Sequence, residues 1–165
     1  KDLSNQMLIA TKSSKIDITL EKNTKSISQK ISHYLIKGDI IFLYGEIGIG
    51  KTTFIRHLIN YLQLKYNLKA TEIPSPTFNI VYEYKIGELI IQHYDLYRLK
   101  SEMELKNIGL FENQKDFITL VEWPEIIKKK PKKIIELIFN YEENLSKRSL
   151  IISSNYKKEI FNELK

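Results

Sequence analysis

The residues best suited to chemistry form one short run, Gly45-Glu46-Ile47-Gly48-Ile49-Gly50-Lys51-Thr52. This run matches the phosphate-loop pattern G-x-x-x-x-G-K-[ST] at every fixed position. Glycine allows backbone conformations that other residues avoid, so main-chain N–H groups can turn toward phosphate oxygens. Lys51 would place its ammonium on the β- and γ-phosphates, Thr52 could ligate Mg²⁺, and Thr53 would add a second hydroxyl. The pattern therefore predicts nucleoside triphosphate binding.

Two carboxylates could complete a magnesium site. Asp95 ends the segment LIIQHYD and Glu122 ends FITLVE, and both segments are expected to be strands. Both side chains would emerge at the carboxyl edge of the sheet, where ligands of open α/β sheets bind. A second oxygen ligand is needed because Thr52 supplies only one. Spacing alone leaves open which carboxylate holds the metal and which polarises the attacking water.

Three neighbouring features have both a functional and a structural interpretation. Residues 75–78 (SPTF) precede an expected hairpin, and their hydroxyls could meet the γ-phosphate or belong to an ordinary proline turn. Trp123 directly follows Glu122, so it would lie beside the phosphates if Glu122 does, although a lone Trp is more often a core residue. His93, two residues before Asp95, either lines the site or packs in the core.

The elements that must position these residues alternate between strand and helix. Apolar runs and alternating patterns predict strands at 16–20, 40–44, 80–84, 88–94, 117–121, 134–139 and 150–153. Helical periodicity and capping residues predict helices at 24–37, 52–64 and 101–109, and a polar helix within 154–165. This order predicts an α/β, three-layer P-loop NTPase fold, with a mainly parallel central sheet and an antiparallel hairpin.

Length and composition limit the class of protein. At about 150 residues per domain, 165 residues predict a single domain, with residues 1–15 disordered or foreign to it. The absence of Cys excludes disulfides, thiolate metal sites and cysteine nucleophiles. We expect a cytoplasmic protein without a membrane segment, because no apolar run approaches the roughly 18 residues of a membrane span and the first residues lack a secretory h-region.

The net charge of +6 invites a nucleic-acid interpretation. Only Arg56, Arg98 and Arg148 of the 26 cationic residues are Arg, the residue type that best recognises phosphates and base edges. Lysine is tolerated on any surface, so the charge is a weak indicator. The densest basic run, 128–133, is best explained as a solvated loop; contact with tRNA or with an acidic protein is the alternative.

The segments GEIGIGKTTF, SPTF, HYDLYRL and VEWPE, in this order, resemble the TsaE family of small P-loop ATPases of bacterial tRNA threonylcarbamoyladenosine biosynthesis. The likeness covers about residues 16–153, and the later segments are more selective than the P-loop itself. The resemblance implies a slow ATPase that uses ATP and Mg²⁺ and works with TsaD and TsaB. That assembly would modify the adenosine adjacent to the anticodon of ANN-decoding tRNAs, so this chain would meet tRNA only through the complex.

The resemblance also implies roles for residues. Thr52 and Glu122 would ligate Mg²⁺, and Asp95 would be the strand-end acid of the ATPase site. Thr24 would lie near the base or sugar, and Trp123 near the γ-phosphate. The phosphates would be cradled by Gly48, Ile49, Gly50, Lys51, Thr52 and Thr53.

Two other functions are compatible with a P-loop. A small-molecule kinase suits the chain length, but such kinases usually carry an arginine-rich lid, and this chain is poor in Arg. A nucleic-acid-binding protein regulated by nucleotide would rest on the net charge alone. For an ATPase, Arg56 and Arg98 are the candidates for a cation at the γ-phosphate. Arg56 lies on the helix that follows the P-loop and is expected on the surface.

Overall fold

The computed structural model describes residues 9–74 and 79–164, so the SPTF segment, 75–78, lies outside the described residues. In chain order the elements are β1 (Thr11–Lys12), β2 (Ile16–Asp17), α1 (Glu21–Ser32), β3 (Ile40–Tyr44), α2 (Lys51–Lys65), β4 (Val81–Ile86), β5 (Leu89–Asp95), α3 (Glu102–Asn107), β6 (Ile118–Glu122), β7 (Ile135–Glu142), β8 (Lys147–Ser154) and α4 (Ile160–Glu163).

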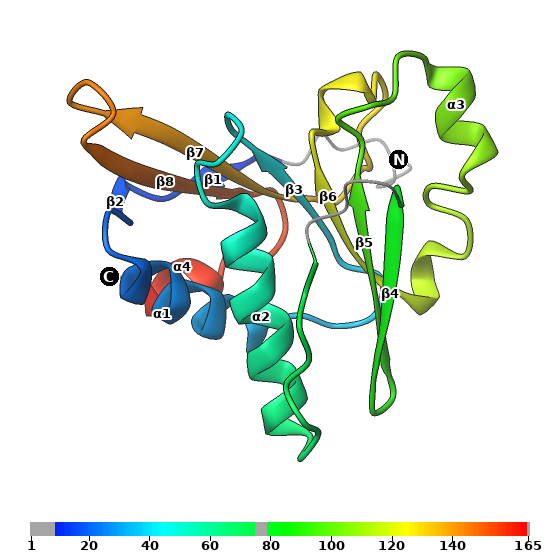
Figure 1. The fold of residues 1–165 in the computed structure, drawn as a ribbon, viewed down its shortest axis with the longest axis horizontal. Coiled ribbons are helices and arrows are strands. Elements are labelled where there is room, and N and C mark those ends of the chain that lie inside the picture. The colour runs from blue at the N-terminus through cyan, green and yellow to red at the C-terminus, as the bar shows by residue number, and fades with distance from the viewer. Residues whose placement is uncertain (1–8, 75–78, 165) are drawn as a thin grey trace, which may run out of the picture.

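The strands of the described residues form one mixed sheet in the order β1-β8-β7-β3-β6-β5-β4, with β2 also paired to β8 (Figure 1). The central strands β7, β3, β6 and β5 run parallel, as the sequence predicts. The β4–β5 hairpin is the predicted antiparallel one. The last two strands form a second hairpin, which the sequence did not predict. Its turn includes Glu143, Asn144 and Leu145, all with positive φ. The turn lacks the glycine that usually marks such backbone conformations, so the residue types gave no hairpin signal.

The sheet separates two apolar clusters. The larger cluster joins the sheet to α1, α2 and α4, which lie together in Figure 1. It includes the whole predicted stripe of α2: Phe54, Ile55, Leu58, Ile59 and Leu62. The smaller cluster lies on the other face, where α3 and the irregular segments around it cover Phe42, Tyr94 and Val121. The fold therefore has three layers, and one of the outer layers is mostly irregular.

The continuous apolar run of β3 is buried on both faces, since Ile41 and Leu43 belong to the larger cluster and Phe42 to the smaller. A parallel central strand needs this pattern because both its faces are covered. Within the described residues, no helix combines the length and the hydrophobicity needed to cross a bilayer.

The N-terminal elements differ from the sequence prediction. Helix α1 begins at Glu21, not at residue 24, and Thr24 is buried inside it. A local turn explains the early start, because the Asp17 carboxylate accepts a 2.8 Å hydrogen bond from Thr19 N–H, and Asn23 Nδ2 donates to Asp17 O. This turn also ends β2 at Asp17, short of residue 20. Within residues 1–15, which the sequence suggested to be disordered or foreign to the domain, β1 pairs with β8.

The C-terminal segment is also less helical than predicted. Strand β8 continues to Ser154, and α4 spans only Ile160–Glu163. The Ser154 hydroxyl accepts hydrogen bonds from the N–H groups of Tyr156 and Lys157, which turns the chain back toward the sheet. The side chains of Tyr156 and Lys157 then reach Asp39 at the start of β3. Tertiary contacts thus hold residues that a local pattern assigns to a helix.

Candidate functional site

The loop between β3 and α2 crosses the carboxyl end of the parallel strands. Its shape requires glycine at two points. A Cβ on Gly45 would lie 2.8 Å from Ile49 Cγ2 and 3.0 Å from Phe139 Cβ, so only glycine permits this approach. Gly50 precedes α2 with φ of 122°, a conformation that L side chains rarely adopt. The first N–H groups of α2 and its positive dipole end therefore open toward the loop.

Lys51 lies at the point where this loop meets Trp123. Its ammonium donates a hydrogen bond to Gly45 O and lies 3.6 Å from the centroid of the Trp123 ring. Only 4% of Lys51 is exposed. Burial lowers the pKa of Lys51, while the Glu122 carboxylate acts in the opposite direction. An anion brought to this ammonium would offset the cost of its burial.

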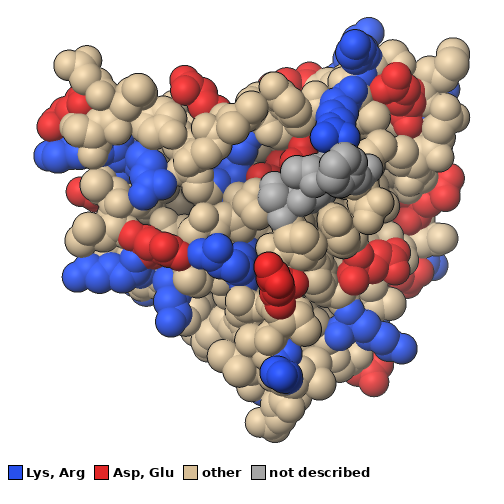
Figure 2. All heavy atoms as spheres, in the orientation of Figure 1, with Lys and Arg blue, Asp and Glu red and all other residues tan. Residues whose placement is uncertain are grey.

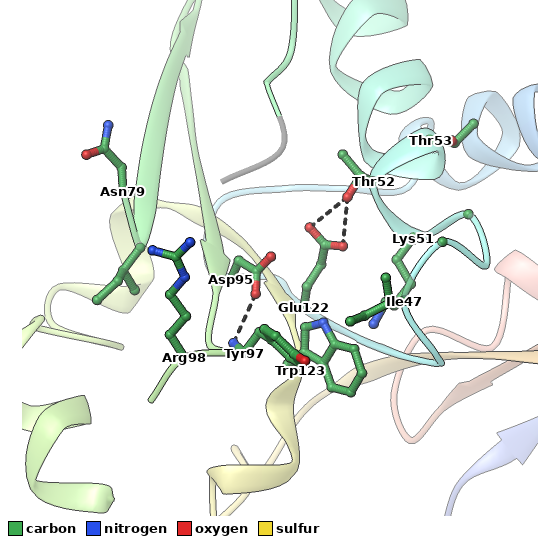
Figure 3. Close-up of a pocket in the computed structure, with 13 residues that line it drawn as sticks. Ile47, Lys51, Thr52, Thr53, Asn79, Asp95, Tyr97, Arg98, Glu122 and Trp123 are labelled. Atoms are coloured by element: carbon green, nitrogen blue, oxygen red, sulfur yellow. Dashed lines mark hydrogen bonds between the residues drawn. The ribbon is translucent and has the colours of Figure 1, made fainter. Parts of the chain in front are cut away.

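Thr52 and Glu122 are in direct contact across the site. The Thr52 hydroxyl donates to the Glu122 carboxylate, with its Oγ1 2.9 Å from Oε1 and 3.2 Å from Oε2 (Figure 3). Glu122 ends β6, which pairs in parallel with β3, so strand order brings the carboxylate to the start of α2. A hydroxyl and a carboxylate side by side are hard oxygen donors of the kind Mg²⁺ prefers. The donor set present here fits that ion.

Asp95 lies beside Glu122 because the two residues are register partners on the parallel strands β5 and β6. Asp95 Oδ1 accepts a 3.0 Å hydrogen bond from Tyr97 N–H. Burial raises the pKa of Asp95; the Tyr97 N–H opposes this shift and the Glu122 carboxylate adds to it. Glu122 is therefore the acid that contacts Thr52. The burial of Asp95 increases the proton affinity of its carboxylate.

A cavity of about 350 Å³ opens between these groups. Figure 3 shows Lys51 and Thr52 at one end of the group, Arg98 at the other, and Asp95 and Glu122 between them. Its lining residues come from the loop, from α2, from the segment before β4 and from the ends of β5 and β6: Ile47, Gly48, Gly50, Lys51, Thr52, Thr53, Asn79, Ile80, Asp95, Tyr97, Arg98, Glu122 and Trp123.

Two residues from the expected site do not line this cavity. Ile49 is 1% exposed and packs beneath the loop against Gly45, although its main chain remains part of the loop. Thr24 is 4% exposed within α1, where the helix turns it toward the core. Trp123 does line the cavity, and it also packs against the smaller apolar cluster, so both interpretations of this residue apply.

The three arginines lie in different places, and one of them lines the cavity. Arg98 lines the cavity three residues after Asp95, where β5 ends (Figure 3). Arg56 instead bonds Glu21 of α1 at 2.6 Å and has a 42% exposed side chain, as expected for the surface. Arg148 of β8 donates to Ile49 O at 3.2 Å and to Thr19 O at 3.0 Å, and so ties the loop to β8.

The sequence did not identify four of the lining residues: Ile47, Asn79, Ile80 and Tyr97. Their positions in the chain were the available signal, because Tyr97 lies two residues after Asp95, where β5 ends, and Ile47 lies inside the glycine-rich loop. His93 was left open; it is absent from the cavity lining and instead contacts Glu122 from below.

Charge on the surface is mixed. Figure 2 shows Lys and Arg side chains interspersed with Asp and Glu side chains over the face drawn there. In the basic run, Lys130 bonds Glu136 at 3.0 Å and Lys128 lies 3.9 Å from Glu102. These ion pairs agree with a solvated loop.

Comparisons with known proteins match most of the chain. A family model described as "Threonylcarbamoyl adenosine biosynthesis protein TsaE" matches residues 18–150. A Rickettsia conorii protein named tRNA threonylcarbamoyladenosine biosynthesis protein TsaE is 36% identical over 146 residues, covering 79% of this chain and 81% of the relative. A Bacillus subtilis protein with the same name is 32% identical over 119 residues, 71% of each chain. The crystal structure of Bacillus subtilis YdiB matches with a TM-score of 0.68 and 23% identity, covering 94% of this chain and 95% of that one, which shows the fold.

Proposed function

This chain belongs to the TsaE family, and we propose that it binds and hydrolyses ATP with Mg²⁺ as a subunit of tRNA threonylcarbamoyladenosine biosynthesis. The names of its relatives support the role in that biosynthesis. The observation that carries the ATP-dependent part is the 2.9 Å contact between Thr52 Oγ1 and Glu122 Oε1 beside the phosphate loop. This pairing has the composition of a P-loop magnesium site.

Binding of the triphosphate rests on the loop and on the start of α2. The main-chain N–H groups from Gly48 to Thr53 and the dipole of α2 would hold the phosphate oxygens. Lys51 would exchange Gly45 O and the Trp123 ring for the β- and γ-phosphates, since a charged partner is the stronger acceptor. Bound Mg²⁺ would neutralise charge on the same phosphates, with Thr52 and Glu122 holding it.

Hydrolysis requires a group that orients water and accepts its proton. Asp95 is the candidate, because it lines the cavity beside Glu122 and its pKa is raised by burial. A carboxylate with raised proton affinity is a better general base. This division leaves Glu122 for the metal and Asp95 for the water.

The partners are proposed to be TsaD and TsaB, which raise the turnover of a slow isolated subunit. Exposed apolar side chains at the cavity support a docked partner there. Ile47 is 65% exposed and Tyr97 57% exposed, and both line the cavity. Apolar side chains exposed beside a polar cleft are typical of protein-contact sites.

Calorimetry and phosphate release test the proposal. The wild-type protein should show heat on ATP addition with Mg²⁺, and Lys51→Ala should abolish it while Lys65→Ala, at the exposed end of the same helix, should not. Phosphate release should be slow alone and faster with TsaD and TsaB. No heat with any nucleotide would overturn ATP binding, and unchanged rates would overturn activation by partners. A phosphorylated small molecule in place of inorganic phosphate would favour the kinase alternative.

A further inference from the structure

His93 is a buried polar side chain to which the function above gives no role. It lies on β5, on the same strand face as Asp95 and one step deeper in the sheet, and its side chain is 0% exposed. Its Nε2 lies 2.7 Å from Glu122 Oε2. Its Nδ1 is buried and has no hydrogen-bonding partner within the described part of the chain.

The contact fixes which ring nitrogen carries the hydrogen. A carboxylate that ligates a metal ion only accepts hydrogen bonds, so with Glu122 in that role Nε2 is the donor. A hydrogen on Nδ1 would be a buried donor facing no acceptor among the described residues. The hydrogen bond to Glu122 Oε2 is therefore the one polar contact of this ring within the described residues.

The Glu122 carboxylate is thus contacted by side chains of two elements, α2 and β5. Thr52 contacts it from the cavity, where the Thr52 oxygen is itself a proposed metal ligand. His93 contacts it from a fully buried position on β5 that does not line the cavity. Of the two donors, only His93 is independent of what enters the cavity.

Packing alone does not explain a histidine here. Its neighbours on this face, Ile91 and Leu120, are 0% and 1% exposed members of the larger apolar cluster. An imidazole among aliphatic side chains costs free energy unless its polar atoms are paired, and an aliphatic side chain would fill the space without that cost. The bond to Glu122 is what distinguishes histidine from leucine at this position.

We propose that His93 is a positioning residue that fixes the Glu122 carboxylate in the orientation that receives Mg²⁺. This inference rests on the proposed function, because it assumes that Glu122 ligates the ion. Partners that hydrogen-bond a ligating carboxylate typically contribute a factor of about 10–100 in metal affinity.

Substitutions at His93 can separate the hydrogen bond from the packing. His93→Gln places an amide nitrogen the same number of bonds from Cβ as Nε2, so it keeps the donor. His93→Asn places its amide at the Nδ1 position, and His93→Leu has no donor. His57→Gln is the matched control, since His57 lies on α2 and contacts Glu21 at 2.8 Å, outside the cavity lining.

The measured quantity is the ratio of the ATP dissociation constant in EDTA to that in Mg²⁺, read with a fluorescent ATP analogue and the full chain. We expect this ratio to fall by about tenfold or more in His93→Leu and His93→Asn, with affinity in EDTA unchanged. The ratio should stay within about threefold of wild type in His93→Gln and in His57→Gln. Melting temperatures identify variants that fail to fold, and the comparison of Gln with Asn decides the question if the Leu variant is lost.

Equal ratios in all variants would overturn the positioning role, and so would equal losses in the Gln, Asn and Leu variants, which would indicate packing. A wild-type protein that binds ATP equally with and without Mg²⁺ would instead refute the metal site itself. Failure of the proposed function is therefore distinguishable from failure of this inference.

Discussion

The Lys51 ammonium lies 3.6 Å from the centroid of the Trp123 ring. The lysine of the glycine-rich loop therefore packs on the residue that directly follows Glu122 at the end of β6. Trp123 holds this place with a left-handed backbone, φ 57° and ψ 54°, which is uncommon for a residue with a side chain of this size. The Tyr97 ring lies 4.9 Å from the Trp123 ring on the cavity side. An aromatic face thus stabilises the ammonium at the edge of the proposed phosphate site.

This contact predicts a fluorescence signal. Trp123 is the only tryptophan of the chain, so its emission reports on its surroundings alone. ATP should draw the Lys51 ammonium from the ring to the phosphates and change the emission, which a titration in a fluorimeter measures. AMP, which lacks the β- and γ-phosphates, should change it less. Equal responses to both nucleotides would contradict the movement of Lys51.

Glu122→Gln should separate binding from turnover. The substitution keeps the shape of the side chain but removes the charge that would hold Mg²⁺, so phosphate release should fall by about 100-fold or more. ATP affinity in EDTA should change little, because the loop amides and Lys51 are intact. Glu125→Gln, an exposed acid in the 3₁₀ turn that follows, is the control. Normal turnover in Glu122→Gln would refute the assignment of Glu122.

Asp95→Asn should raise the thermal stability of the protein at neutral pH. The pKa of Asp95 lies above its ordinary value of 3.8, chiefly through burial, so the ionised form is disfavoured in the fold. Ionisation of Asp95 therefore destabilises the folded wild-type protein. This effect is absent below the pKa of the unfolded state, grows as pH rises from that pKa to the pKa of the folded state, and is complete above the latter. The difference in melting temperature between variant and wild type should therefore increase from acidic to neutral pH. A constant difference across that range would contradict the pKa shift.

A buried ion pair between Asp39 and Lys157 should stabilise the C-terminal segment. Lys157 Nζ lies 2.6 Å from Asp39 Oδ2, and Tyr156 donates to Asp39 Oδ1 at 2.6 Å. Asp39→Asn would leave the Lys157 ammonium buried without its counter-charge, which costs about 3–5 kcal/mol of unfolding free energy in urea titrations. Lys15→Ala, which removes an exposed ion pair with Glu142, should change it little. Equal effects of the two substitutions would refute the special role of the buried pair.

Residues close together in the chain were predictable. β3 was predicted at its observed limits, because a short continuous apolar run bounded by glycines favours a strand covered on both faces. The stripe of α2 follows from the helical period, and the loop between them from its glycines and Lys51. The Ser101 cap of α3 is equally local, since its hydroxyl accepts from Glu104 N–H three residues later.

The tertiary structure decided which side chains of different elements come into contact. Thr52 finds Glu122 seventy positions away, and His93 reaches the same carboxylate from β5, because the order of the parallel strands is set by burial across the whole sheet. The same long-range packing buries Thr24 and brings Arg98 to the cavity while Arg56 bonds Glu21. Local propensity acts over a turn or a strand. The chemistry of this site depends on contacts between strand ends, which only the assembled sheet brings together.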